Sequence, residues 1–281
     1  MSHPPAVEKR GWARTLVRWL ATKYYPNIEI SGAERIPQTG PVLLCANHAN
    51  SLIDPVLVGV VAKRPVRFMA KAPLFEAPLL GPVMKALGMI PAFRGSDDAR
   101  EVKRNIESLD VGAKVLVDGR AMGIFPEGKS TDQAHVEMVR SGAARMALQA
   151  VGEGAKGLLV VPLGITYERK DAFRTSVWIQ VGEPIDVEQC LEEHDGNERT
   201  ARRALTQELE TRLKAVVVHL DEPQWEPWLG DLQTLAEAPQ DTTKETTPPL
   251  KRRKRIYDAI TYFLDKDRPR TESVASDIKA Y

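Results

Sequence analysis

Apolar runs of strand length alternate along the chain with stretches in which apolar residues recur at helical spacing. Continuous runs at residues 41–46 and 157–167 predict buried strands, because they have the length of a strand and contain no charged residue. Shorter extended segments predict strands at residues 27–31, 66–70, 122–125 and 177–181. Helical periodicity predicts helices at residues 57–62, 78–87, 96–117, 131–150 and 197–220. The alternation is typical of an α/β domain, with a mixed, mostly parallel sheet of about six or seven strands flanked by helices.

The N-terminal stretch, residues 10–25, has the periodicity of an amphipathic helix. Such a basic helix either packs on its own domain or docks at a membrane, where aromatic rings lie at headgroup depth and arginines meet anionic lipids. Both interpretations stay open. The apolar positions are Trp12, Leu16, Trp19, Leu20 and Tyr24, and the basic positions on the opposite side are Arg10, Arg14 and Arg18.

The composition changes after residue 221. Residues 222–250 are polar and punctuated by proline, which is typical of a linker. Five consecutive bases, Lys251 to Arg255, then lead into apolar positions at helical spacing. This segment either packs on the larger domain or adds a second basic membrane contact. The predicted organisation is an amphipathic helix (1–25), an α/β domain (26–221), a linker (222–250) and a basic C-terminal segment (251–281).

Composition and charge exclude several classes of protein. Apolar residues make up 43% of the chain and charged residues 27%, and no apolar run reaches the ~18 residues of a membrane span. A net charge of +1 gives no overall field that would attract nucleic acid. Only two cysteines occur, Cys45 and Cys190, and they lack the paired spacing of a metal knuckle or a disulfide framework, which favours a reducing, cytosolic environment. We expect a peripheral protein without a metal site at the cytoplasmic face of a membrane.

His48 and Asp54 come directly after the apolar run at residues 41–46. Loops beyond the carboxyl ends of parallel strands carry the sites of open α/β sheets. An imidazole there could take the proton of an attacking hydroxyl, and a carboxylate could orient the ring and stabilise the imidazolium. Asp54 followed by Pro55 is also typical of the start of a helix, so the spacing alone does not decide between a catalytic and a structural role.

Four segments in order resemble the sequence blocks of the glycerolipid acyltransferases, the family of glycerol-3-phosphate and 1-acylglycerol-3-phosphate acyltransferases. The resemblance extends over residues 28–184 and implies the fold of that family. The five residues between His48 and Asp54 resemble the branch that includes glycerol-3-phosphate acyltransferases. The four segments are Asn47-His48 with Asp54, Gly-Met-Ile-Pro-Ala-Phe-Arg at 88–94, Phe-Pro-Glu-Gly-Lys-Ser at 125–130, and Val-Pro-Leu-Gly at 161–164.

The resemblance implies transfer of a fatty acyl group from acyl-CoA or acyl-carrier protein to the hydroxyl of glycerol-3-phosphate or its monoacyl ester, in phospholipid synthesis and without a cofactor. His48 would be the general base and Asp54 its orienting partner. Lys71 would support the oxyanion, and Arg94 would bind the acceptor phosphate through its guanidinium fork. Glu127 and Gly128 would shape the acceptor pocket, and the residues lining the site would be Asn47, Phe93, Pro126 and Pro162.

Two other functions are compatible with parts of the sequence. Residues 123–130 also satisfy the P-loop pattern of a nucleotide triphosphatase. A phosphate-binding loop needs successive backbone N–H groups, however, and Pro126 has none, while Glu127 would place a carboxylate beside the phosphates. The other alternative is a non-catalytic lipid-binding module, against which the presence of both His48 and Asp54 argues.

Overall fold

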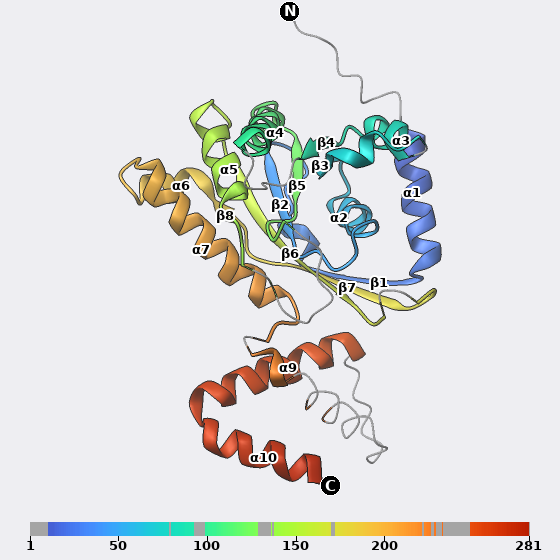
Figure 1. Ribbon diagram of the computed structural model, residues 1–281, viewed down its shortest axis with the longest axis vertical. Helices are drawn as coiled ribbons and strands as arrows, with labels where there is room; N and C mark the ends of the chain where they lie inside the picture. The colour runs from blue at the N-terminus through green and yellow to red at the C-terminus, as the bar shows by residue number, and fades with distance from the viewer. Residues whose placement is uncertain are drawn as a thin grey trace, which may run out of the picture.

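The computed structural model describes residues 11–78, 80–92, 99–128, 136, 138–169, 172–220, 222–225, 228, 232 and 248–280 (Figure 1). The strands are β1 (Asn27–Ser31), β2 (Val42–Ala46), β3 (Val66–Lys71), β4 (Ile90–Ala92), β5 (Ala121–Ile124), β6 (Leu159–Tyr167), β7 (Ser176–Val181) and β8 (Ile185–Asp186). The helices are α1 (Gly11–Tyr24), α2 (Asp54–Ala62), α3 (Leu80–Ala86), α4 (Ala99–Val117), α5 (Gly142–Gly152), α6 (Val187–Glu192), α7 (Glu198–Val216), α9 (Pro249–Lys266) and α10 (Arg268–Ala280).

In the part of the chain that the structure describes, the strands form one eight-stranded sheet in the order β1-β7-β6-β2-β5-β3-β4, with β8 paired to β6. β2 lies at the centre, parallel to both β5 and β6. β7 and β8 run antiparallel to β6, which makes the sheet mixed but mostly parallel. Parallel strands buried on both faces are apolar throughout, and all five residues of β2 are buried.

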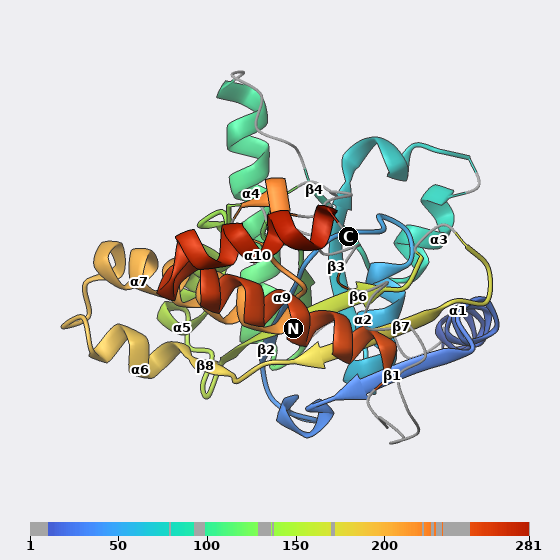
Figure 2. The ribbon, with the colours of Figure 1, turned by 90° about the horizontal axis from the view of Figure 1, so that it is seen from below.

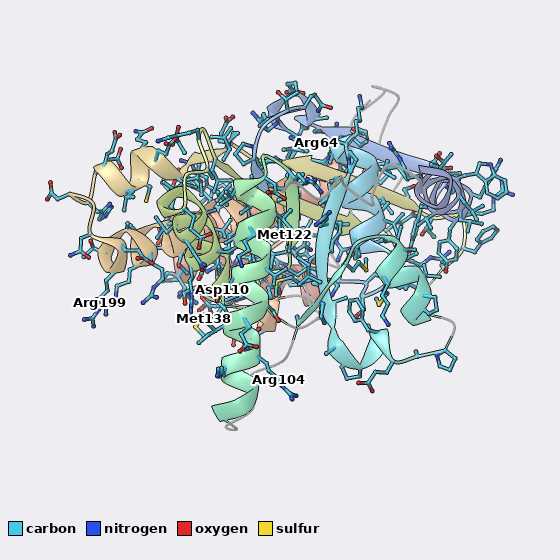
Figure 3. All side chains as sticks on the ribbon, turned by 90° about the horizontal axis from the view of Figure 1, so that it is seen from above. Arg64, Arg104, Asp110, Met122, Met138 and Arg199 are labelled. Carbon is cyan, nitrogen blue, oxygen red and sulfur yellow. The ribbon has the colours of Figure 1, made fainter. Side chains whose placement is uncertain are left out.

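Helices cover both faces of the sheet (Figure 1). Alternate residues of β2 therefore pack into the cores on opposite faces. Leu43 and Cys45 join the core beneath α4, α5 and α7, whereas Val42, Leu44 and Ala46 join the core beneath α2. Figure 3 shows Met122 of β5 in the crowded interior, while Arg104 of α4 and Arg199 of α7 project from the outer surface. The central strand therefore has no solvent-facing side, and its carboxyl end is the part that can present side chains to a substrate.

The helices α9 and α10 form a pair on one side of the sheet domain (Figures 1 and 2). Tyr257, Ile260 and Leu264 of α9 share a small core with Val218 and Leu220, the residues after α7. The basic stretch at the start of α9 also faces the domain: Lys251 forms an ion pair with Glu29 of β1 and lies over the ring of Trp178. Within the described residues, no helix is long and apolar enough to span a membrane.

Several predicted elements differ from the observed ones. The sheet has one strand more than the upper expectation, because β4 and β8 are too short to produce a recognisable alternation. Of the helix predicted at residues 131–150, residues 131–135 and 137 lie outside the described residues, and α5 begins at Gly142. The backbone N–H of Arg140 donates instead to Pro126 O at 3.0 Å, so a tertiary contact replaces helical pairing there. The division of the chain into four regions stays a prediction.

Candidate active site

His48 and Asp54 flank the loop that joins the central strand β2 to α2. His48 lies two residues beyond the end of β2, and Asp54 is the first residue of α2. The helix predicted at residues 57–62 therefore begins earlier, and Asp54 followed by Pro55 does open it, although the capping position itself is Ile53. The first turn of a helix stabilises a negative charge, so the fold places the Asp54 carboxylate where an anion is favoured.

The two side chains are in direct contact. His48 Nδ1 lies 2.9 Å from Asp54 Oδ2, which is hydrogen-bond distance. The Asp54 side chain is fully buried, whereas 16% of the His48 side chain is exposed. With Asp54 ionised, Nδ1 carries the hydrogen and Nε2 keeps a free lone pair. In this arrangement a substrate can reach the imidazole of His48, which can act as a base, but it cannot reach the carboxylate of Asp54, which supports that base.

The Asp54 carboxylate receives two further hydrogen bonds. The backbone N–H of Asn50 donates to Oδ2 at 2.8 Å, and the hydroxyl of Tyr167 donates to Oδ1. Burial raises the pKa of Tyr167 far above its ordinary value, and the charge of Asp54 raises it further, so the hydroxyl stays protonated and donates. Sequence reasoning missed Tyr167. Its only signal is a tyrosine as the last residue of a buried strand that neighbours β2.

A second set of contacts fixes the backbone and ring of His48. Its N–H donates to Oε1 of Glu127 at 3.0 Å, and the Glu127 side chain is almost completely buried. The imidazole stacks on the ring of Phe125, with centroids 4.0 Å apart and planes inclined by 12°. Phe125 lies in the matched segment 125–130 but was not among the predicted site residues. The segment at residues 125–130 therefore fixes the position of His48 through a hydrogen bond and a ring contact.

Asn47 has a structural role that the sequence did not reveal. Its side chain bridges to β6 through both amide atoms: Nδ2 donates to Ile165 O at 3.0 Å, and Ile165 N–H donates to Oδ1 at 2.7 Å. These bonds continue the pairing of β2 with β6 one residue beyond the strand. They fix the point at which the chain leaves the sheet and so place His48.

The remaining predicted residues lie at different distances from this cluster. Lys71 is exposed at the carboxyl end of β3, two strands from β2 in the sheet order. Pro162 is buried within β6, opposite Cys45. Pro126 and Gly128 belong to the turn after β5, where Gly128 has a φ of 74° that favours glycine. Phe93 and Arg94 lie outside the described residues. The structure thus brings His48, Asp54, Asn47 and Glu127 together.

The first glycine of the P-loop pattern does not lie in a loop. Gly123 is part of β5, and a Cβ atom there would lie 2.2 Å from the ring of Phe68. The glycine therefore makes room for an aromatic side chain that packs on the strand. A phosphate-binding loop would need this residue free to turn toward a ligand.

Comparison with known proteins finds a matching family and similar sequences. Residues 27–166 match the acyltransferase family. The chain is 28% identical over 195 residues to a 1-acyl-sn-glycerol-3-phosphate acyltransferase of Borreliella burgdorferi, covering 66% of this chain and 72% of that protein. It is 33% identical over 167 residues to a lyso-ornithine lipid O-acyltransferase of Pseudomonas aeruginosa, covering 59% and 58%. It is 22% identical to glycerol-3-phosphate O-acyltransferase 2 of Saccharomyces cerevisiae, covering 60% and 37%.

The fold has a solved counterpart. The crystal structure of the 1-acyl-sn-glycerophosphate (LPA) acyltransferase of Thermotoga maritima superposes with a TM-score of 0.50 and 17% identity, covering 74% of this chain and 83% of that one. This likeness concerns the fold alone and confirms the predicted α/β class with a mixed, mostly parallel sheet. The sequence relatives confirm the resemblance on which the site residues were predicted. The chain belongs to the acyltransferase family of lipid metabolism.

Proposed function

We propose that this protein transfers a fatty acyl group from a thioester donor, acyl-CoA or acyl-carrier protein, to the hydroxyl of glycerol-3-phosphate or 1-acylglycerol-3-phosphate. The observation that carries the proposal is the pair formed by His48 and Asp54, 2.9 Å apart, with the carboxylate buried and the imidazole partly exposed. The relatives named above include acyltransferases for both acceptors.

In the proposed reaction, Nε2 of His48 takes the proton of the acceptor hydroxyl while that oxygen attacks the thioester carbonyl. Asp54 stabilises the imidazolium that forms. The tetrahedral intermediate then breaks its C–S bond, and the leaving thiolate takes the proton from His48. The acceptor attacks directly, so no residue of this chain carries the acyl group and no acyl-enzyme accumulates.

Other residues have proposed roles around this step. Lys71 supports the negative charge on the thioester oxygen, and Arg94 binds the acceptor phosphate. Support for Lys71 comes from its exposure at the carboxyl end of a parallel strand, the edge of the sheet that also carries His48. Glu127 holds the backbone of His48, and Gly128 and Pro162 border the substrate site.

The test offers the purified chain a radiolabelled acyl-CoA or acyl-carrier protein with one acceptor at a time. The acceptors are glycerol-3-phosphate, 1-acylglycerol-3-phosphate and a lyso-ornithine lipid, the last because one relative bears that name. We expect labelled product from at least one glycerophosphate acceptor. His48→Gln should lose turnover and keep its fold, whereas His194→Gln, at a half-buried histidine just after α6, should keep both. Wild-type protein that binds lipid but produces no labelled product would overturn the proposal.

We also propose that α1 rests on the cytoplasmic face of a membrane. Leu16, Trp19 and Leu20 are each about half exposed, at 46%, 52% and 51%. The opposite side of the helix packs on α2, where Arg18 donates to Val60 O at 3.3 Å. Lys23 lies 5.9 Å from the ring of Trp19, which places a cation beside the exposed apolar side chains. Exposed aromatic and apolar residues with adjacent bases suit a surface of anionic lipid.

Sedimentation with vesicles containing anionic phospholipid tests this contact. Trp19→Ser combined with Leu20→Ser should reduce binding at least tenfold, because two partly inserted side chains are lost. The matched control combines Tyr262→Ser and Phe263→Ser, which are 55% and 52% exposed on α9. An equal loss of binding in both double variants would contradict a specific role for α1.

A further inference from the structure

Tyr167 lies on the side of the Asp54 carboxylate opposite His48. It is the last residue of β6 and is only 8% exposed. Its hydroxyl donates to Oδ1, while His48 and the backbone of Asn50 both contact Oδ2. The hydroxyl therefore touches the carboxylate through an oxygen that the histidine does not use.

We infer that Tyr167 is a positioning residue of the acyl-transfer site, which controls the orientation and the proton affinity of His48 through Asp54. The inference rests on the proposed function. It assigns a task to a side chain that lies 113 positions from Asp54 in the sequence and belongs to a different element of the fold.

The first effect of Tyr167 is geometric. A carboxylate held at only one oxygen can rotate about its Cβ–Cγ bond, but Asp54 is held at both. The hydroxyl fixes Oδ1, and the N–H of Asn50 fixes Oδ2 at 2.8 Å, which keeps Oδ2 directed at Nδ1 of His48. Reactive groups need this restraint because small misplacements reduce the rate strongly.

The second effect is electrostatic. A hydrogen bond to Oδ1 draws negative charge away from the carboxylate and weakens its attraction for the imidazolium. A histidine with too strong a partner would keep its proton and fail to act as a base at neutral pH. The ionisable groups around this pair are Asp54 of α2, Glu127 after β5, Tyr167 itself and the buried Tyr25 after α1.

The position of the Tyr167 ring is fixed independently of its hydroxyl. The residue pairs with Val177 in the β6–β7 ladder, and its ring lies against Tyr25 with centroids 5.5 Å apart. Removal of the hydroxyl alone should therefore leave the ring in place. Tyr167→Phe isolates the hydrogen bond from the packing.

The experiment measures acyl transfer by the wild-type chain and by Tyr167→Phe across pH. We expect kcat to fall about tenfold with little change in KM, the size expected for one lost hydrogen bond to a charged group. The pH midpoint of kcat should move upward by about half a unit, since the full carboxylate charge now retains the imidazolium proton. The control is Tyr257→Phe, which removes the hydroxyl of a buried tyrosine in α9 and should change neither quantity.

A substrate-independent readout separates this inference from the proposed function. The Nδ1 proton of His48, bonded to a carboxylate, should give a low-field proton NMR signal that is absent in His48→Gln. Tyr167→Phe should shift that signal, and Tyr257→Phe should not. In an Asp54→Asn background, Tyr167→Phe should cause no further loss of kcat, because the hydroxyl acts through the carboxylate.

Each outcome has a defined meaning. An unchanged kcat, pH midpoint and NMR signal in folded Tyr167→Phe overturn the inference, as does full additivity with Asp54→Asn. Wild-type protein without turnover on any acceptor overturns the proposed function, while the NMR comparison still tests Tyr167. If Tyr167→Phe does not fold, replacement of Tyr167 by a ring-fluorinated tyrosine strengthens the hydroxyl as a donor and should move the pH midpoint downward. No shift there overturns the inference.

Discussion

Gly164 of β6 provides the sharpest test of how the fourth matched segment contributes to the protein. The segment, residues 161–164, was interpreted as part of the substrate site. In the structure, a Cβ atom at Gly164 would lie 1.8 Å from the carbonyl oxygen of Val216 and 2.4 Å from its carbonyl carbon, at the end of α7. The glycine thus lets the end of α7 approach the sheet closely. Gly164→Ala should therefore lower the free energy of unfolding, and its main effect should not be on acyl transfer.

The expected magnitude follows from that approach. The added methyl group is about 1.5 Å short of an ordinary van der Waals contact, and its neighbours are backbone atoms that no rotamer change can move. Overpacking of this kind costs about 3 kcal/mol. Alanine has a smaller conformational entropy than glycine in the unfolded chain, which stabilises the folded protein by about 1 kcal/mol. The free energy of unfolding should therefore fall by a net amount of about 2 kcal/mol. With a urea m-value of about 3 kcal/mol/M, the unfolding midpoint should fall by about 0.7 M.

Urea unfolding followed by far-ultraviolet circular dichroism measures this shift. The matched control is Gly59→Ala in α2, where an added Cβ atom meets nothing within 4 Å. Alanine is the better helix former by about 1 kcal/mol, so the control should be at least as stable as the wild type. A Gly164→Ala protein with a wild-type midpoint but no acyl-transfer activity would refute the packing argument and indicate that Gly164 itself contributes to the substrate site.

Three further expectations concern single side chains. Glu127→Ala leaves the N–H of His48 without this acceptor and should lower kcat about tenfold in the acyl-transfer assay, whereas Glu127→Gln, which keeps an acceptor oxygen, should lower it less. Gly128→Ala, at a φ of 74°, should lower the free energy of unfolding by about 1–2 kcal/mol, measured in urea; an unchanged midpoint would contradict the strain. Burial raises the pKa of the Cys45 thiol, so at pH 8 a thiol reagent should modify only the partly exposed Cys190 in the native protein. In urea both cysteines should react. Rapid modification of Cys45 in the native protein would contradict its burial.

Much of the architecture could be predicted because its signals are local. The apolar run at residues 41–46 coincides with the central strand, and the pairing of His48 with Asp54 follows from a loop short enough to bring both side chains together. The contribution of Tyr167 could not be predicted, since it depends on which strand lies beside β2 and on how far that strand extends. Glu127 was expected to shape the acceptor pocket, which stays a prediction, and the structure adds its bond to the His48 backbone.

The strand β6 holds the loop between β2 and α2 at both of its ends. The backbone of Ile165 is bonded to Asn47 at the beginning of the loop, and the hydroxyl of Tyr167 is bonded to Asp54 at its end. Because both attachment points lie on one strand, the distance between them restricts the length of the loop that joins them. The length of this loop therefore determines whether the carboxylate can reach Tyr167. In a protein with a shorter loop, a different residue of the sheet would have to donate to the carboxylate.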